Sequence, residues 1–180
     1  MSSEKTIAEG LFELYAARQS EFREYFQGAQ IFLAHLKEAL RETIGLPEYY
    51  EQGGQRYPWA RMYKWDSETG RVEHVESQFD VDTMNEKGEL EAAIGITLAH
   101  ALNSSPKSNF YVAVRIRPTR TEFHVSIGPD RETSLTFARN ATDFPQFYDA
   151  FLRLLEDTLR RSPYDMSAES FTAKPGIGFI

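Results

Sequence analysis

The sequence predicts an α+β domain: an antiparallel β-meander of about five or six strands packed against a long N-terminal helix and a C-terminal helix. Three patterns carry this prediction. Residues 110–127 alternate apolar and polar side chains, residues 4–44 carry a helical apolar stripe, and a second stripe follows Pro145. We expect one domain over residues 1–161 and a tail, residues 162–180, that is either flexible or docked.

The stretch at residues 110–127 is the clearest signal for a sheet. Its odd and even positions separate apolar from largely polar side chains up to residue 117, and the alternation resumes at residues 122–127. Pro118 interrupts the pattern between the two runs, because proline cannot donate to a β-ladder and favours a turn. Two such runs predict an antiparallel hairpin with one face on the core.

The long helix is predicted from apolar residues that recur at steps of three and four across residues 4–44. Gly28 lies within this stripe, where glycine costs about 1 kcal/mol relative to alanine. We therefore expect a bend or break near Gly28.

The ends of this helix also have sequence signals. Thr6 with Glu9 makes a capping box, and Ser3 is an alternative N-cap. Gly45 followed by Pro47 predicts the C-terminus, as a C-cap glycine and a stopping proline do.

The segment between this helix and the hairpin is predicted with less uniform signals. Residues 46–56 are expected to form a loop with a tight reversal at its two glycines, and residues 57–65 a strand with an aromatic face. Residues 72–81 alternate weakly. Residues 89–102 fit both a strand and a helix, and we favour the strand. Residues 134–139 predict a last strand, and a helix begins around Asp143 and Pro145.

Composition limits the classes of partner. The chain of 180 residues has a formal charge of −7, which disfavours nucleic acids and anionic membranes. It contains no cysteine, which excludes disulfides and cysteine zinc sites and agrees with a cytoplasmic protein. The N-terminus lacks the uninterrupted apolar core of a secretory signal, and no run is long enough to span a membrane.

Sequence motifs for chemistry are weak. The four histidines have no partner at helical or zinc-finger spacing, so we expect no metal site and no cofactor. The run from Asp80 to Asn85 resembles a calcium loop only at its start, since Met84 and Asn85 occupy positions that require a ligand and a glycine. There is no G-x-S-x-G nucleophile motif.

Candidate binding residues come from the aromatic strand at residues 57–65 and from the predicted hairpin at residues 110–127. The aromatic strand offers rings and one arginine, and the polar face of the hairpin offers two arginines in a stretch, residues 106–121, that contains no acid. Arginine and aromatic side chains are typical anchors for partners and anions. The predicted partner- or ligand-binding residues are Tyr57, Trp59, Arg61, Trp65, Tyr111, Arg115, Arg117 and His124.

We therefore expect a small acidic protein-binding module without catalytic activity, of adaptor, immunity-protein or chaperone type. One alternative is a ligand-binding or catalytic domain with an aromatic and arginine-lined pocket for an anionic small molecule. Another is a homo-oligomer in which the first helix pairs with itself, although the stripe does not hold the strict heptad of a coiled coil.

Overall fold

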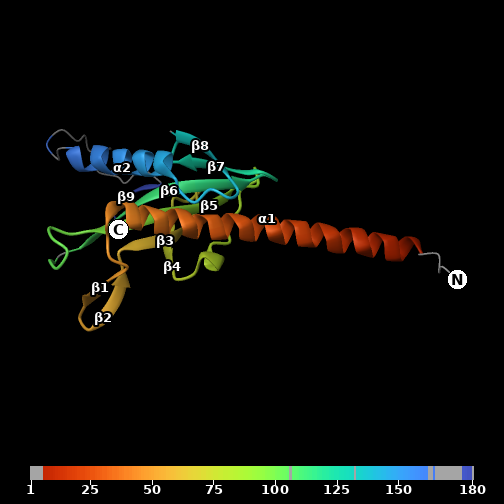
Figure 1. The fold of residues 1–180 in the computed structure, drawn as a ribbon, viewed down its shortest axis with the longest axis horizontal. Coiled ribbons are helices and arrows are strands. Elements are labelled where there is room, and N and C mark those ends of the chain that lie inside the picture. The colour runs from red at the N-terminus through yellow and green to blue at the C-terminus, as the bar shows by residue number, and fades with distance from the viewer. Residues whose placement is uncertain (1–5, 106, 132, 162–163, 165–175, 180) are drawn as a thin grey trace.

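The computed structural model describes residues 6–105, 107–131, 133–161, 164 and 176–179 (Figure 1). It is an α+β fold with two helices, a large antiparallel sheet and a separate hairpin. The elements are α1 (Ile7–Ile44), β1 (Tyr49–Gln52), β2 (Gln55–Pro58), β3 (Ala60–Trp65), β4 (Val72–Val75), the 3-10 helix η1 (Gln78–Asp80), β5 (Leu90–Leu98), β6 (Ser108–Pro118), β7 (Glu122–Ile127), β8 (Thr133–Ala138), α2 (Pro145–Arg160) and β9 (Ile177–Phe179).

The main sheet has seven strands, and β1 and β2 form a sheet of their own. Its order is β4-β3-β5-β6-β7-β8, with antiparallel pairing throughout. The long strand β6 pairs with β7 through residues 114–118 and with β9 through residues 110–112. The C-terminal strand thus lies in line with β7 along the same edge of β6. Because β6 is central, the hairpin at residues 110–127 organises the sheet as expected.

Both helices cover one face of this sheet, and the main core lies between them and the strands. Period-two alternation on β5, β6 and β7 sends one set of apolar side chains toward the helices, where they are fully buried. On α1, Phe32 stacks on Phe123 of β7 with ring centroids 4.0 Å apart. Phe110 of β6 meets Phe151 of α2 edge-on at 5.9 Å. These aromatic contacts fix both helices over the centre of the sheet.

Helix α1 confirms the predicted stripe and caps. Thr6 accepts from the backbone N–H of Glu9, and the Glu9 carboxylate accepts from the backbone N–H of Thr6, which is the expected capping box. Gly45 ends the helix with φ of 77°, a left-handed conformation that favours glycine. The break expected near Gly28 is wrong, because α1 continues through it as one helix of 38 residues.

Two further predictions need correction. Residues 46–56 are not a loop: they contain β1 and the start of β2, with Gly53 and Gly54 at the turn in left-handed conformations of φ 62° and 79°. Residues 57–65 are not one strand, because the chain leaves β2 after Pro58 and re-enters as β3 at Ala60. The weak alternation over residues 72–81 corresponds to a strand only as far as Val75, after which the chain forms η1.

Other predictions are confirmed. The ambiguous segment at residues 89–102 forms the nine-residue strand β5, which lies between β3 and β6. The hairpin, the last strand before α2 and α2 itself lie where their patterns placed them. Within the tail expected at residues 162–180, the described residues 177–179 form β9, and Ile180 lies outside the described residues.

The N-terminal half of α1 extends beyond the sheet (Figure 1). Residues 7–24 are exposed to solvent, apart from the half-buried Gly10, whereas the rest of α1 contributes buried side chains to the core. We call residues 7–24 the projecting half and residues 25–44 the anchored half.

Candidate functional site

The eight predicted site residues do not gather in one pocket; the structure distributes them over three places. Tyr57, Trp59 and Arg61 lie at or near the β1–β2 hairpin. Trp65, Tyr111 and Arg115 lie together on the face of the main sheet opposite the helices. Arg117 and His124 are paired in register at the far end of β6 and β7.

The β1–β2 hairpin carries a cluster of rings and cations. The Tyr50 ring lies 5.5 Å from the ring of Tyr57 and 4.8 Å from that of Trp59, measured between centroids. The ammonium of Lys107 sits 4.9 Å above the Tyr50 ring, a cation–π distance. Trp59 is buried in this cluster, so its ring supports the hairpin rather than facing solvent.

Arg61 is the arginine of the hairpin region that has no carboxylate partner among the described residues. Its guanidinium donates to the Tyr50 hydroxyl at 3.2 Å and lies 5.9 Å from the Tyr57 ring centroid. Its Nε is buried and donates to no acceptor in the described part of the chain. It helps line a pocket of about 530 Å³ formed by Lys37, Tyr49, Arg56, Tyr57, Pro58, Ala60, Arg61, Met62, His74, Val75 and Glu76.

This pocket has the chemistry of an anion site. Three cationic side chains and the carboxylate of Glu76 line it; Lys37 also pairs with Glu38 and Arg56 with Glu51, each at 3.4 Å, which leaves Arg61 as the cation without a described carboxylate partner. The pKa of His74 is lowered, first by partial desolvation and then by the charge of Arg61, so the imidazole is biased toward its neutral form. Tyr57 supplies a ring wall beside Arg61. The arrangement suits a ligand that carries a carboxylate or phosphate and a planar group.

Trp65, Tyr111 and Arg115, on the sheet face opposite the helices, are buried rather than exposed to a partner. Arg115 is 7% exposed, and its guanidinium carbon lies 4.5 Å from the centroid of the Trp65 ring. It donates to the Glu91 carboxylate at 3.4 Å and to the carbonyl oxygens of Gly128 and Pro129 at 3.3 and 3.2 Å. Burial is the main cause of its lowered pKa. These contacts occupy the guanidinium, so Arg115 stabilises the structure locally.

Gly176 explains part of this burial. A Cβ at Gly176 would lie 2.9 Å from Cβ of Ala113 and 3.0 Å from the Trp65 ring, so only glycine fits against this face at that position. The backbone N–H of Ala113 donates to the carbonyl of Gly176 at 2.6 Å. Gly176, which directly precedes β9, therefore packs on Trp65 and Ala113.

The third group remains accessible. Arg117 is exposed and His124 is half-buried, and their Cα atoms are partners in the β6–β7 ladder. The His124 ring nitrogen Nδ1 lies 3.2 Å from the Thr136 hydroxyl on β8. Glu122 lies on the neighbouring strand, but it forms no ion pair with Arg117 among the ion pairs of the described residues.

Local patterns in the sequence do not predict the ion-pair network beside Arg115. Arg131 donates to both carboxylate oxygens of Glu89, at 2.7 and 2.5 Å, and Asn85 donates to the same carboxylate at 2.8 Å. Arg131 lowers the pKa of Glu89 to about 2. Arg131 adopts φ of 56°, an uncommon value for a side-chain-bearing residue. Because the pairing joins residues 42 positions apart, no local pattern could reveal it.

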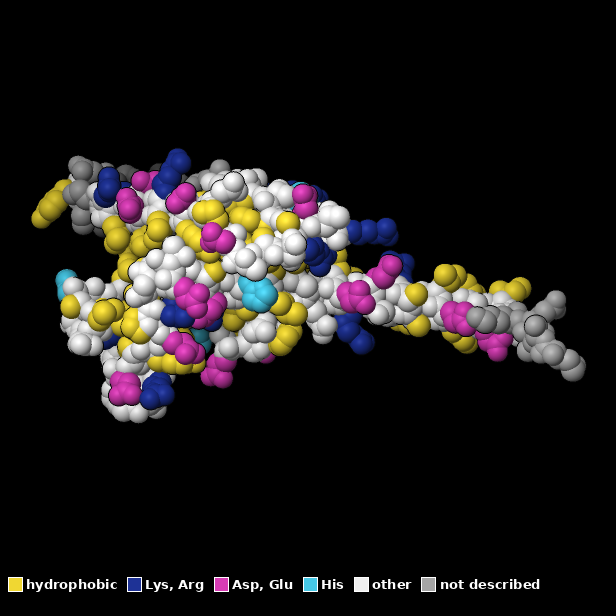
Figure 2. Space-filling model, in the orientation of Figure 1, with side chains coloured by type: hydrophobic (Ala, Val, Ile, Leu, Met, Phe, Trp, Pro, Cys, Tyr) yellow, Lys and Arg dark blue, Asp and Glu magenta, His cyan; other side chains and the backbone are white. Residues whose placement is uncertain are grey.

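The projecting half of α1 carries six of the thirteen large apolar side chains that are exposed among the described residues. Figure 2 shows its hydrophobic side chains clear of the rest of the molecule. The helical stripe was predicted, but its exposure was not. The large apolar side chains concerned, with their exposed fractions, are Ile7 86%, Leu11 60%, Phe12 72%, Leu14 69%, Tyr15 65% and Phe22 59%.

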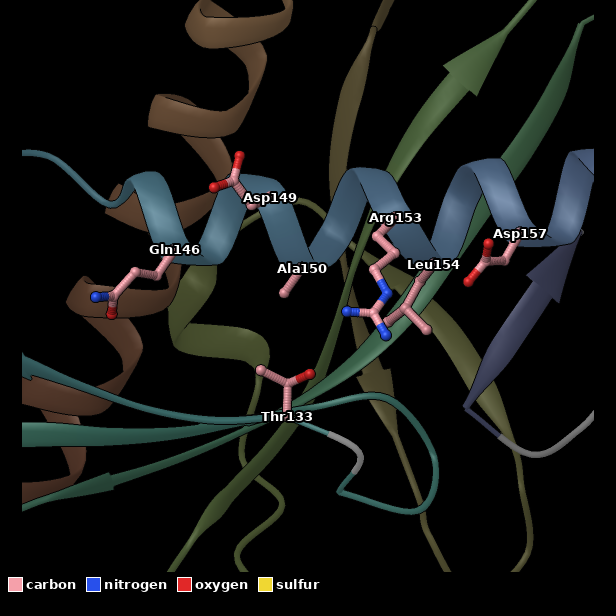
Figure 3. A pocket seen from close by; sticks show the side chains of 7 residues that line it. All are labelled: Thr133, Gln146, Asp149, Ala150, Arg153, Leu154 and Asp157. Atoms are coloured by element: carbon pink, nitrogen blue, oxygen red, sulfur yellow. The ribbon is translucent and has the colours of Figure 1, made fainter.

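A further hollow of about 420 Å³ lies between α2 and the start of β8 (Figure 3). Its charged side chains are Arg153, Asp149 and Asp157, and in the close-up Asp149 points away from Thr133 while Arg153 points toward it. Among the described residues that line the hollow, no hydrogen bond joins Thr133 to a carboxylate.

The described residues form neither a cluster of metal ligands nor a membrane-spanning helix. Among them, no three histidine, aspartate or glutamate side chains lie close enough together to hold a metal ion. Neither described helix combines the length and apolar character needed to cross a bilayer.

Comparison with known proteins adds no family. The sequence matches no family model, no curated protein and no solved structure. Functional conclusions therefore rest on the chain itself.

Proposed function

We propose that this chain is a protein-binding module whose projecting half of α1 docks, through its apolar side chains, onto another polypeptide. One observation carries the proposal: six large apolar side chains are at least 59% exposed within 16 consecutive positions, residues 7–22. Scattered exposed apolar residues are ordinary, but a contiguous patch of this size marks an interaction surface.

The polar side of the same helix argues against a membrane as the partner. Helices that lie on membranes carry lysine and arginine opposite the apolar face. The projecting half has four glutamates against two arginines, a formal charge of −2. Anionic lipid would repel this surface, whereas a protein groove would accept the apolar face and leave the glutamates in water.

Site-specific photo-crosslinking tests the proposal. A benzoyl-phenylalanine placed at Phe12 in the full chain should yield a protein adduct in the source cell, and the adduct should disappear with Leu11→Glu. The matched control is the same crosslinker at Phe79, a 51% exposed ring on the body of the protein. The proposal fails if no adduct depends on Leu11, or if Phe79 yields the same adduct.

A second function is favoured by the Arg61 pocket: binding of an anionic small molecule with a planar group. Its support is an arginine with a buried, unpartnered Nε beside two further cations. Titration of phenyl phosphate and of inorganic phosphate, followed by NMR, should shift signals of Arg61 and Tyr57 more strongly with phenyl phosphate. Arg61→Gln should abolish the shifts, while Arg71→Gln, at an exposed arginine elsewhere, should not. Equal shifts in both variants would exclude the pocket.

A further inference from the structure

We infer that the polypeptide bound by the projecting half is a second copy of this chain, with the two projecting halves side by side and antiparallel. The inference rests on the proposed docking function and names its partner. Three features support it: the continuity of the apolar face along α1, the charges at the two ends of the projecting half, and the area available for contact.

The apolar face of α1 continues without rotation from the core into solvent. At 3.6 residues per turn, Ile7, Leu11 and Phe22 fall on the side of the helix that Leu36 and Leu40 present to the sheet, with Arg18 between Leu11 and Phe22 on the same side. Leu36 and Leu40 are fully buried by the strands, but the sheet ends before the projecting half begins. The projecting half therefore presents a core-type face that another element must cover.

The base of the projecting half forms a corner with the β6–β7 turn. A pocket of about 490 Å³ lies there. Arg120 and Arg139 line it from the body, and neither forms an ion pair with a described residue. The corner is lined by Glu21, Glu24, Tyr25, Pro118, Thr119, Arg120 and Arg139.

The described tip of α1 carries acidic side chains. Residues 6–17 contain two acidic residues, Glu9 and Glu13, and no basic residue. In an antiparallel pair the acidic tip of each copy lies at the corner of the other, where Arg120 and Arg139 balance the formal charge of Glu21 and Glu24. A parallel pair would instead place the two acidic tips together. Charge thus favours the antiparallel arrangement.

The length of the projecting half sets the register. The tip of one copy can advance until it reaches the other copy's body at Tyr25, so Ile7 faces Tyr25 and facing residue numbers add to about 32. Leu14 then faces Arg18 of the second copy. The two-fold axis passes near residue 16.

The contact is large enough for a stable dimer. With roughly 100–150 Å² exposed per side chain of this size, the six apolar residues offer on the order of 800 Å² on each copy. Covering about two thirds of this area on both copies buries on the order of 1,000 Å², the lower bound for a specific interface. The net charge of −7 per chain opposes association only weakly, because salt screens charges more than about 8 Å apart at physiological ionic strength.

Light scattering coupled to size-exclusion chromatography tests the inference on the full chain. We expect a mass of twice 20.7 kDa at micromolar concentration, and the monomer mass for the double variant Leu11→Glu/Phe22→Glu. The control is Leu159→Glu, at a leucine of α2 with similar exposure, 56% against 60% for Leu11, which should remain dimeric. Unchanged circular dichroism of each variant checks that it folds.

Disulfide trapping tests the antiparallel register, and the absence of native cysteine makes it clean. Chains with Leu14→Cys and chains with Arg18→Cys, mixed in equal amounts, should link to each other faster than either links to itself. Preferential linking of Leu14→Cys chains to themselves would overturn this register, because it occurs in a parallel pair or in an antiparallel pair shifted by four residues.

The results separate this inference from the proposed function. A monomeric wild-type chain that still gives a Leu11-dependent adduct with a different protein overturns the second copy as partner and retains the docking function. A dimer that survives Leu11→Glu/Phe22→Glu also overturns the inference, since its interface lies elsewhere. A monomer without any Leu11-dependent adduct overturns both.

Discussion

The two halves of α1 share one apolar periodicity and differ in what surrounds them. In the anchored half, Phe32, Leu33, Leu36 and Leu40 are at most 3% exposed and pack on the sheet. In the projecting half, side chains of the same kind and spacing are in water. The difference shows that an apolar stripe predicts a helix and the side on which it is covered, but not the element that covers it.

The boundary between the halves is marked by polar contacts. The Tyr25 hydroxyl donates to the carbonyl of Gly88 at 2.5 Å, and the buried Gln30 donates to the carbonyl of Val81 at 2.9 Å. These bonds tie α1 to the loops around β5 where the sheet ends. Changes on the two sides of this boundary should therefore have different consequences.

The largest difference is expected for leucine truncation. Leu36→Ala removes a fully buried side chain and should lower the free energy of unfolding by about 2–5 kcal/mol. Leu11→Ala, in the projecting half, should change it by less than about 0.5 kcal/mol in the dilute monomer, because its side chain is already in water. Urea denaturation followed by circular dichroism measures both. Similar losses for the two variants would show that the projecting half is packed within one chain.

Acid should also act differently on the body of the protein and on the tip of the projecting half. Glu89 has a pKa of about 2, which is below its ordinary 4.5 mainly because Arg131 donates to it, with a smaller contribution from Asn85. A lowered pKa contributes stability that is present above pH 4.5 and is lost as the pH falls toward 2. Solvent screening of this partly buried ion pair reduces the contribution to about 1–3 kcal/mol. Glu9, at the exposed tip, has its pKa lowered by the capping bonds with Thr6, chiefly the one to the backbone.

Glutamine substitutions separate these two carboxylates. Glu89→Gln should lower the free energy of unfolding at pH 6, and its difference from the wild type should shrink steadily between pH 4.5 and pH 2. Glu9→Gln should affect only helicity in the first turn of α1 and leave global unfolding unchanged. Denaturation series at several pH values measure this. A Glu89→Gln difference independent of pH would mean that the ion pair with Arg131 does not stabilise the fold.

Local patterns in the sequence predicted most of the elements but not what covers the second face of the sheet. The parity of Tyr111 and Arg115 placed them correctly on the face opposite the helices. Parity carries no information on burial, however, and contacts distant in sequence decide it: Gly176 lies against Trp65, and Gly128 accepts from Arg115. The same limit applies to Arg131 and Glu89.

The hairpin β1–β2 shows a different limit of prediction. Pro47 and the glycine pair at residues 53–54 favour a loop, and only the reversal was predicted there. Tyr50 faces Tyr57 across the strands, and this ring pair stabilises strands too short to give a periodic pattern. Trp59 continues the parity of Tyr57 in the sequence, yet it lies between two strands. The strand pattern alone therefore could not predict a ligand pocket beside Arg61.

The smallest difference is expected for glycine substitution in the two halves. In Gly28→Ala the new methyl would lie 3.2 Å from one terminal nitrogen of Arg139, an exposed side chain that can move by a few tenths of an ångström. The variant should gain about 0.5–1 kcal/mol of stability, because alanine loses less backbone entropy in a helix. In Gly10→Ala the methyl has no neighbour within 4 Å, so the same gain should appear as helicity of the projecting half and leave global unfolding unchanged. Thermal unfolding together with helicity from circular dichroism measures both variants. A loss of stability in Gly28→Ala would show that the Arg139 side chain cannot move away from the new methyl group. The two hydrogen bonds from Arg139 to the carbonyl of Thr119 would then hold its guanidinium in place against α1, at the start of the anchored half.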